Sequence, residues 1–264
     1  MAEDIKVGII GCLGRMGRAN TEAIANASGA IVVAGSEMAG HPSLGETIPD
    51  TDVTITGNAR SVFETADVVI DFTPPGNTAV HAVFAAETGT ALVVGTTGLT
   101  ALDEQALDAA AKSTVIIQAG NYSLGVNLLK ALTKQLAAKL GTDWDIEIVE
   151  MHHKHKVDAP SGTAVMLGES AAEGRGATLD ELRADVRDGI TGERKEGSIG
   201  FSALRGGSVI GEHDVIFASP SERITLSHKA ENRTLFADGA VRAAIWAANK
   251  EPGRYSMMDV LEID

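Results

Sequence analysis

Three histidines and two lysines occupy five consecutive positions of this chain, from His152 to Lys156. They lie in the segment EMHHKHKVDAPSGTA, which begins at Glu150, in a chain that has seven histidines in all and a formal net charge of −14. Imidazole and ammonium groups bind anions in their charged forms, and each can donate a proton near its own pKa. The segment therefore indicates acid–base chemistry on an anionic substrate.

Three interpretations compete for this cluster. It could be a metal site, but Lys154 and Lys156 would repel a cation, and no carboxylate or cysteine stands at a usual ligand spacing. It could be a solvated run of charge. It could be a pocket for a small polyanion, which positive charge gathered in an acidic chain favours. We favour the pocket and expect no metal. Asp158 either orients a lysine or histidine of the cluster or is a simple turn acid.

A turn must follow His152 if the cluster acts on one reacting centre. In an extended strand His152 and Lys156 would share a face but lie about 13 Å apart, which is too far. Ser161 is a natural N-cap for a helix. The backbone amides of Gly162 and Thr163 at that helix start would point at an anion such as a carboxylate. An ordinary capped helix start is the alternative for these two residues.

A second candidate site lies where the strand-like run IKVGII passes directly into GCLGRMG and then into a helix-like run. Gly11, Gly14 and Gly17 permit a tight turn, which lets backbone amides and a helix start approach a pyrophosphate. The spacing is GxxGxxG, with Leu13 where the second glycine of the usual dinucleotide motif stands. The pattern predicts a dinucleotide-binding loop, and a purely structural turn is the alternative.

Glu37 follows the next strand-like run, where a carboxylate can accept hydrogen bonds from the adenosine ribose hydroxyls. A 2′-phosphate would need a cation nearby, and the next residue is Met38. We therefore predict that NADH is used at least as well as NADPH. A solvated loop acid is the alternative for Glu37. Arg15 could still help to bind a phosphate, and Cys12 is expected to serve as a small packing residue.

Three further segments end strand-like runs, where a doubly wound sheet binds its ligand. They are Asp71 to Pro75, Gly95 to Gly98 and Ala119 to Tyr122, with the sequences DFTPP, GTTG and AGNY. Their small and polar residues suit a nicotinamide ribose and carboxamide. A simple turn is the alternative for each segment.

The first half of the chain alternates short apolar, β-branched runs with helix-like runs. Strands are predicted over residues 5–10, 30–36, 53–57, 67–73, 91–96 and 114–120, and helices over 15–27, 77–87 and 101–112. Apolar strands separated by helices indicate a parallel sheet covered on both faces. With right-handed crossovers, this predicts an α/β doubly wound Rossmann domain.

The pattern changes after residue 121. A helix over 123–140, a strand over 144–153, a helix from Ser161, a Gly- and charge-rich stretch over 187–201 and three β-like runs follow. These predict a smaller α+β domain. The amphipathic helix over 235–250 is apolar enough to pack back on the first domain. We therefore predict a dinucleotide-binding domain of residues 1–122 and 233–264, and a second domain of residues 123–232.

Composition excludes several classes of protein. The sequence pI near 4.9 argues against a nucleic-acid partner, which requires a basic face. The apolar runs are far shorter than a membrane span, and the start MAEDIKVGII does not resemble a signal peptide. A single cysteine excludes an intramolecular disulfide and fits a reducing compartment. We expect a cytoplasmic protein that binds neither nucleic acid nor membrane.

Several segments carry a resemblance to a known family. They are EMHHKHKVDAPSGTA, VGIIGCLGRMGR, VVIDFTPP, VVGTTG, AGNYSLGVN, RDGITGERKEGSIGFSALRGGSVIGEH and AENRTLFADGAVRAAIW. In these, the chain resembles the 4-hydroxy-tetrahydrodipicolinate reductase (dihydrodipicolinate reductase) family along nearly its whole length. The resemblance implies NAD(P)H-dependent reduction of 4-hydroxy-tetrahydrodipicolinate to tetrahydrodipicolinate in the diaminopimelate route to lysine.

The resemblance also implies roles for single residues. His152 falls on the family's proton donor/acceptor, Lys156 on its proton donor, and His153, Gly162 and Thr163 on substrate-binding positions. The cofactor-binding positions are Gly11, Cys12, Leu13, Gly14, Arg15, Met16, Glu37, Gly95, Thr96, Thr97, Ala119, Gly120, Asn121 and Tyr122. Hydride is expected to reach a ring carbon while Lys156 protonates the neighbouring atom. His152 orients the substrate, shuttles a proton or assists loss of water.

The family resemblance further implies an assembly and a substrate class. Many relatives carry a basic residue where this chain has Met38. Members of the family are usually homotetramers built through the C-terminal domain. We expect a homotetramer whose second domain binds a small dicarboxylate and mediates tetramerisation. Another two-domain NAD-dependent dehydrogenase of the aspartate family is the alternative. A non-catalytic NADH-sensing regulator is a further one, but it would need a basic, DNA-reading face.

Overall fold

The computed structural model describes residues 3–263, which form two compact units. The first unit comprises the chain up to Leu124 together with the segment from Thr234 onward, and the second is Gly125–Arg233. The assignment of nucleotide binding to residues 1–122 and 233–264, and of substrate binding and tetramerisation to residues 123–232, stays a prediction.

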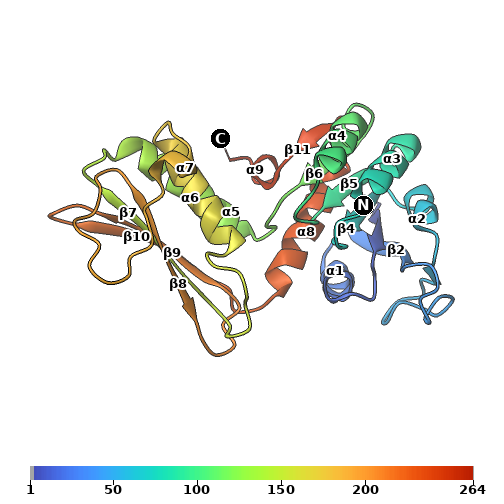
Figure 1. The fold of residues 1–264 in the computed structure, drawn as a ribbon. Coiled ribbons are helices and arrows are strands. Elements are labelled where there is room, and N and C mark those ends of the chain that lie inside the picture. The colour runs from blue at the N-terminus through green and yellow to red at the C-terminus, as the bar shows by residue number, and fades with distance from the viewer. Residues whose placement is uncertain (1–2, 264) are drawn as a thin grey trace. The chain divides into compact units, whose positions relative to one another are not determined.

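The first unit is built on a seven-stranded parallel sheet (Figure 1). Its strands are β1 (Ile5–Ile10), β2 (Ala30–Ser36), β3 (Ile55–Thr56), β4 (Val68–Asp71), β5 (Ala91–Val94), β6 (Val115–Gln118) and β11 (Gly253–Tyr255). The strand order is β11-β6-β5-β4-β1-β2-β3, so the winding reverses beside β1. This arrangement confirms the predicted doubly wound fold, in which ligands bind at the carboxyl ends of the strands near that reversal.

Helices cover both faces of this sheet. They are α1 (Arg15–Asn26), α2 (Ala59–Thr65), α3 (Thr78–Thr88), α4 (Ala101–Ala110), α8 (Thr234–Ala247) and α9 (Met257–Val260). Val68 and Ile70 of β4 belong to a buried cluster with residues of α1 and α8, whereas Val69 belongs to a cluster with residues of α2, α3 and α4. Alternate side chains of one strand are thus buried on opposite faces, which explains the continuous apolar runs in the sequence.

The second unit holds a four-stranded mixed sheet in the order β10-β9-β7-β8. Its elements are α5 (Leu124–Lys139), β7 (Asp145–His152), α6 (Gly162–Gly174), α7 (Leu179–Leu182), β8 (Ile199–Arg205), β9 (Glu212–Ala218) and β10 (Arg223–Lys229). Strand β7 pairs in parallel with β8 and antiparallel with β9. Alternate residues of β7, from Ile146 to His152, are buried, because successive side chains of a strand point to opposite faces of the sheet. Two of these buried side chains, Glu150 and His152, are polar.

Four short elements were not predicted from the sequence. They are α2, α7, β11 and α9, of three to seven residues each. Helix α2 begins after Asn58, whose side chain accepts a hydrogen bond from the Arg60 amide at 3.1 Å. Strand β11 pairs with β6, which lies far away in the sequence. Elements this short give too little periodicity to be recognised. No helix within residues 3–263 is long and apolar enough to cross a membrane.

Candidate nucleotide and acid–base sites

The loop between β1 and α1 needs glycine for two different reasons. Gly11 has a φ of +70°, in the left-handed region that favours glycine. A Cβ on Gly17 would lie 2.1 Å from the Gly11 carbonyl oxygen, which is too close for any residue with a side chain. Gly14 is the N-cap of α1, and no side chain caps the helix there. The first amides of α1 therefore remain available to a ligand such as a phosphate.

A cavity of about 890 Å³ opens beside this loop. Its lining brings together several predicted positions, namely Gly11, Gly14, Arg15, Met16 and Glu37. The segment Phe72–Pro75, which was predicted as a loop at the end of a strand, lines the same cavity. The volume is within the range of pockets that bind small molecules and cofactors.

Glu37 is anchored to the glycine loop. Its Oε1 atom accepts a hydrogen bond from the Leu13 amide at 2.7 Å, so the carboxylate is fixed at the wall of the cavity. The adjacent Met38 is 77% exposed. Cys12 is fully buried, and burial, followed by the charge of Glu37, raises the pKa of its thiol to about 11. Its side chain is thus a neutral packing group, as predicted.

The loops after β5 and β6 contact the loop after β4. Thr96 Oγ1 donates to the Thr73 carbonyl at 2.8 Å, and a Cβ on Gly95 would lie 2.3 Å from the Phe72 ring. Tyr122 is buried, and its hydroxyl lies 2.9 Å from the Val94 carbonyl. In the part of the chain that the structure describes, residues 95–97 and 119–122 do not line the 890 Å³ cavity. Their role in cofactor binding stays a prediction, which for Tyr122 is limited to its main chain.

A buried acid–imidazole pair supports the same cavity and was not found from the sequence. His81 Nδ1 lies 2.6 Å from Asp71 Oδ2, and the other oxygen of Asp71 accepts hydrogen bonds from the Thr73 amide and hydroxyl at 2.8 and 2.6 Å. His81 also lines the cavity. The pair therefore fixes the start of the Phe72–Pro75 segment. The sequence signal that could have revealed this pair was His81, a lone histidine in the predicted helix that follows Asp71.

In the second unit, the histidine cluster begins at the end of β7. His152 Nδ1 lies 2.6 Å from Glu150 Oε2, and both residues are buried. The strand ends there, and the Lys156 amide donates to the His153 carbonyl at 3.1 Å. This bond closes the turn that was predicted to follow His152.

Two carboxylates fix the basic groups of the cluster. Lys156 Nζ lies 2.8 Å from both oxygens of Asp158, and this hydrogen bond lowers the pKa of that carboxyl. Burial alone would raise the pKa of Glu150, but hydrogen bonds from Arg205, His152 and the Ser161 amide bring it below its ordinary value. Both acids are therefore ionised at neutral pH. Of the two possibilities left open for Asp158, the structure supports orientation of a lysine.

Helix α6 begins as predicted, with Ser161 as its N-cap. Ser161 Oγ accepts a hydrogen bond from the Ala164 amide at 3.1 Å and lies 3.0 Å from His213 Nε2. Gly162 and Thr163 are thus the first residues of a capped helix, where amide groups favour an anion. Gly162 is exposed, and a Cβ there would contact nothing.

His213 and Arg205 are the main residues of this site that sequence reasoning missed. They come from β9 and β8, where the sheet register pairs Glu150 with His213 and His152 with Arg205. Burial, followed by the charge of His152, lowers the pKa of His213 to about 4. Burial, followed by the charges of Arg233 and His155, also lowers the pKa of His153. Polar residues at inward positions of the predicted strands were the available signal.

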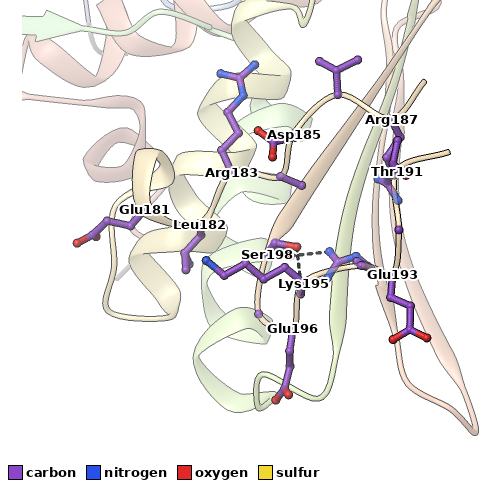
Figure 2. Close-up of a pocket in the computed structure, with 15 residues that line it drawn as sticks. Glu181, Leu182, Arg183, Asp185, Arg187, Thr191, Glu193, Lys195, Glu196 and Ser198 are labelled. Carbon is purple, nitrogen blue, oxygen red and sulfur yellow. Dashed lines mark hydrogen bonds between the residues drawn. The ribbon is translucent and has the colours of Figure 1, made fainter. Parts of the chain in front are cut away.

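Among the described residues, neither a metal centre nor a second cavity adds to the predicted site. Within residues 3–263, no group of three or more His, Cys, Asp or Glu side chains is arranged to hold a metal ion. A cavity of about 250 Å³ is lined by residues 181–187 and 191–198, and Figure 2 draws these residues. Arg194 in its wall binds Asp145 and Glu147 of β7 at 2.8 and 3.1 Å. The cavity contains none of the predicted site residues.

Comparison with known proteins gives matches along the whole chain. The family model described as dihydrodipicolinate reductase, N-terminus, matches residues 5–122, and the corresponding C-terminus model matches residues 125–261. The 4-hydroxy-tetrahydrodipicolinate reductase of Parvibaculum lavamentivorans is 50% identical over 271 residues and covers 100% of both chains. That of Dinoroseobacter shibae is 51% identical over 259 residues, which is 96% of each chain.

Solved structures agree with these matches. The dipicolinate-bound dihydrodipicolinate reductase from Paenisporosarcina sp. TG-14 has a TM-score of 0.81 at 26% identity, covering 97% of this chain and 98% of that one. A probable dehydrogenase from Thermotoga maritima has a TM-score of 0.62 at 12% identity, covering 97% and 92%, and shows a likeness of fold alone.

Proposed function

The chain belongs to the dihydrodipicolinate reductase family, and from this premise we propose how its residues divide the work. The enzyme reduces 4-hydroxy-tetrahydrodipicolinate to tetrahydrodipicolinate in lysine biosynthesis and uses a pyridine nucleotide. The arrangement around Glu150, His152 and Lys156 is the observation that carries the rest of the proposal. It combines two basic groups, fixed by buried or paired acids, with a helix start that favours an anion.

The first unit fits the nucleotide. The glycine loop presents amides for a pyrophosphate. Gly11 and Gly17 allow its tight turn, because a side chain at either position would have no room. Glu37, fixed by the Leu13 amide, would accept hydrogen bonds from ribose hydroxyls. When bound, the reduced nicotinamide supplies a hydride to a carbon of the substrate ring. The loops at residues 95–97 and 119–122 would contact the nicotinamide end.

We propose that NADH is used at least as well as NADPH. A 2′-phosphate would meet the fixed carboxylate of Glu37 and would find Met38 where a cation would help. Among the described residues that line the cavity, Arg15 is the only lysine or arginine. It lies at the glycine loop, where it would serve the pyrophosphate of either nucleotide.

Proton chemistry falls to the second unit. Lys156, held by Asp158, would donate the proton that follows hydride addition. His152 would donate a hydrogen bond from Nδ1–H to the ionised Glu150, so its Nε2 atom would be left to accept and return a proton. This suits a proton shuttle or assistance to the loss of water. His153, Gly162 and Thr163 would bind a substrate carboxylate, which agrees with the dipicolinate in the related structure.

We also propose a cytoplasmic homotetramer assembled through residues 123–232. Val186 is 90% exposed and Ile190 is fully exposed in the single chain, and Leu204 of β8 is half exposed. Burial of these exposed apolar side chains against other copies of the chain would be favourable. Light scattering should give four times the chain mass of 27.4 kDa. A monomer at working concentration would contradict this part of the proposal.

Steady-state kinetics test the whole proposal. The purified enzyme receives 4-hydroxy-tetrahydrodipicolinate from a coupled synthase, and oxidation of NADH or NADPH is followed by absorbance. The expected result is turnover with kcat/KM for NADH at least equal to that for NADPH. A clear preference for NADPH would contradict the assignment of Glu37 and Met38. Turnover of aspartate in place of this substrate would favour the aspartate-family alternative.

A further inference from the structure

We propose that the ion pair between the buried Glu150 and the partly exposed Arg205 is a positioning device, which holds His152, the start of α6 and the Lys156 turn in one fixed arrangement. Neither residue is expected to touch the substrate. The inference rests on the proposed role of His152 as a proton carrier. The Glu150–Arg205 pair would explain why the imidazole of His152 has a single tautomer. It would also explain why this imidazole lies at a fixed distance from the helix start that is proposed to bind a carboxylate.

The carboxylate of Glu150 uses both oxygens fully. Its Oε2 atom lies 2.6 Å from His152 Nδ1 and 2.7 Å from Arg205 Nη1. Its Oε1 atom accepts from the Ser161 amide at 3.0 Å and from Arg205 Nη2 at 2.7 Å. The side chain of Glu150 is 1% exposed. A buried carboxylate with four donors has no freedom to rotate without leaving one of them unpaired.

The first consequence concerns the tautomer of His152. An ionised carboxylate can only accept, so the neutral imidazole must carry its proton on Nδ1. The Nε2 atom then has a lone pair and faces away from Glu150, where a Cβ on Gly211 would lie 3.0 Å from it. Free neutral histidine prefers the opposite tautomer. Glu150 therefore selects the form of His152 that can accept a proton from the site.

The second consequence concerns spacing. Ser161 is the N-cap of α6, and its amide is bound to the same carboxylate as His152. One rigid group thus sets the separation between the proton carrier and the helix start that is proposed to bind a carboxylate. Binding energy at Gly162 and Thr163 would then place the substrate at a fixed position relative to His152.

Arg205 connects Glu150 to the turn that carries Lys156. It forms a bidentate pair with Glu150, and its Nη2 atom also donates to the Asp158 carbonyl at 2.7 Å. The side chain of Asp158 in turn holds Lys156. Arg205 also balances the charge of Glu150, so the buried acid does not cancel the positive potential of the cluster.

The chain offers a matched control for Glu150. Glu147 lies on the same strand but on the opposite face of the sheet. It also pairs with arginines, Arg187 and Arg194. It makes no contact with His152 in the described structure. Glu147→Gln therefore removes the same charge from the same strand and breaks similar bonds without touching the proposed device.

The experiment combines nitrogen NMR of labelled histidine with steady-state kinetics. In the wild-type enzyme, His152, assigned with the His152→Gln variant, should show a proton on Nδ1. Glu150→Gln should populate the Nε2 tautomer, lower kcat at least about tenfold, as loss of an orienting partner does, and raise the KM for substrate. Glu147→Gln should leave the tautomer and both constants within about twofold of wild type. Arg205→Lys, which keeps the charge but loses the fork, should also lower kcat.

Each outcome bears on the proposal. An Nε2 proton on wild-type His152, or a Glu150→Gln enzyme that matches Glu147→Gln in tautomer and kinetics, would overturn it. Loss of activity in Glu150→Gln with an unchanged tautomer would overturn it as well. If Glu150→Gln fails to fold, the wild-type tautomer and Arg205→Lys decide. Unchanged kcat in His152→Gln would instead refute the proposed function of His152, while the tautomer would still report on Glu150.

Discussion

His213 should make the second unit less stable in mild acid. The residue is 4% exposed, its Nε2 atom lies 3.0 Å from Ser161 Oγ, and its pKa is lowered from 6.5 to about 4, mainly by burial. In the unfolded chain the same side chain takes up a proton near its ordinary pKa. Because the unfolded state binds the proton first as the pH falls, folding free energy is lost between pH 6.5 and 4.

The size of the effect follows from these pKa values. Each unit of difference corresponds to about 1.4 kcal/mol, so the full penalty, reached below pH 4, is about 3 kcal/mol. Between pH 7.5 and pH 5, His213 alone should cost about 2 kcal/mol. Glu150 has a lowered pKa and so loses its stabilising contribution only below the ordinary carboxyl range. His153 and His228 also have lowered pKa values and act with the same sign.

The variant His213→Gln isolates this contribution. Glutamine keeps a polar group near Ser161 but does not titrate, whereas His153 and His228 remain in both proteins. Hydrogen exchange of amides in β7 and β9 gives the opening free energy of this unit by itself. Between pH 7.5 and pH 5, wild type should lose about 2 kcal/mol more than the variant. Equal losses in the two proteins would refute the conclusion that His213 is buried in its neutral form.

Three further predictions concern the first unit. Met38→Arg should raise the ratio of kcat/KM for NADPH to that for NADH about tenfold or more, and an unchanged ratio would mean that residue 38 is not near the ribose 2′ position. Gly17→Ala should weaken nucleotide binding, measured by calorimetry, at least about tenfold, because its Cβ would lie 2.1 Å from Gly11 O; wild-type affinity would contradict the proposed loop. Thr100→Ala removes a capping box with Asp103 and should cost about 1 kcal/mol of stability in urea unfolding, while an altered kcat would show that this cap affects the site.

The sheet of the first unit could be predicted because each strand carries its own local signal. Strands β1 and β2 are mostly apolar runs, and their predicted and observed bounds coincide. Strand β11 could not be predicted in this way. It has three residues of sequence GRY, and only its pairing with Val115–Ile117 of β6 makes it a strand. Pairing between distant segments leaves no periodic pattern in either one.

In the acid–base site, too, residues close together in the sequence could be predicted and residues brought in by strand pairing could not. His152, Lys156 and the Ser161 cap stand within ten residues, so their types and spacing could be interpreted together. Arg205 and His213 reach them only through the register of β7 with β8 and β9. Register is a tertiary property, and a shift of one residue would turn both side chains to the other face. The groups that orient the site were therefore hidden, although the groups proposed to carry the chemistry were visible.

The role of Lys156 as proton donor is the central claim, and the chain supplies its own control. Lys156→Ala and Lys154→Ala each remove one lysine from the same turn, but only Lys156 is paired with Asp158. In the coupled assay, Lys156→Ala should lower kcat by about a hundredfold or more, with NADH affinity unchanged by calorimetry. Lys154→Ala should keep kcat within about twofold of wild type. Equal kcat values for the two variants would contradict the account.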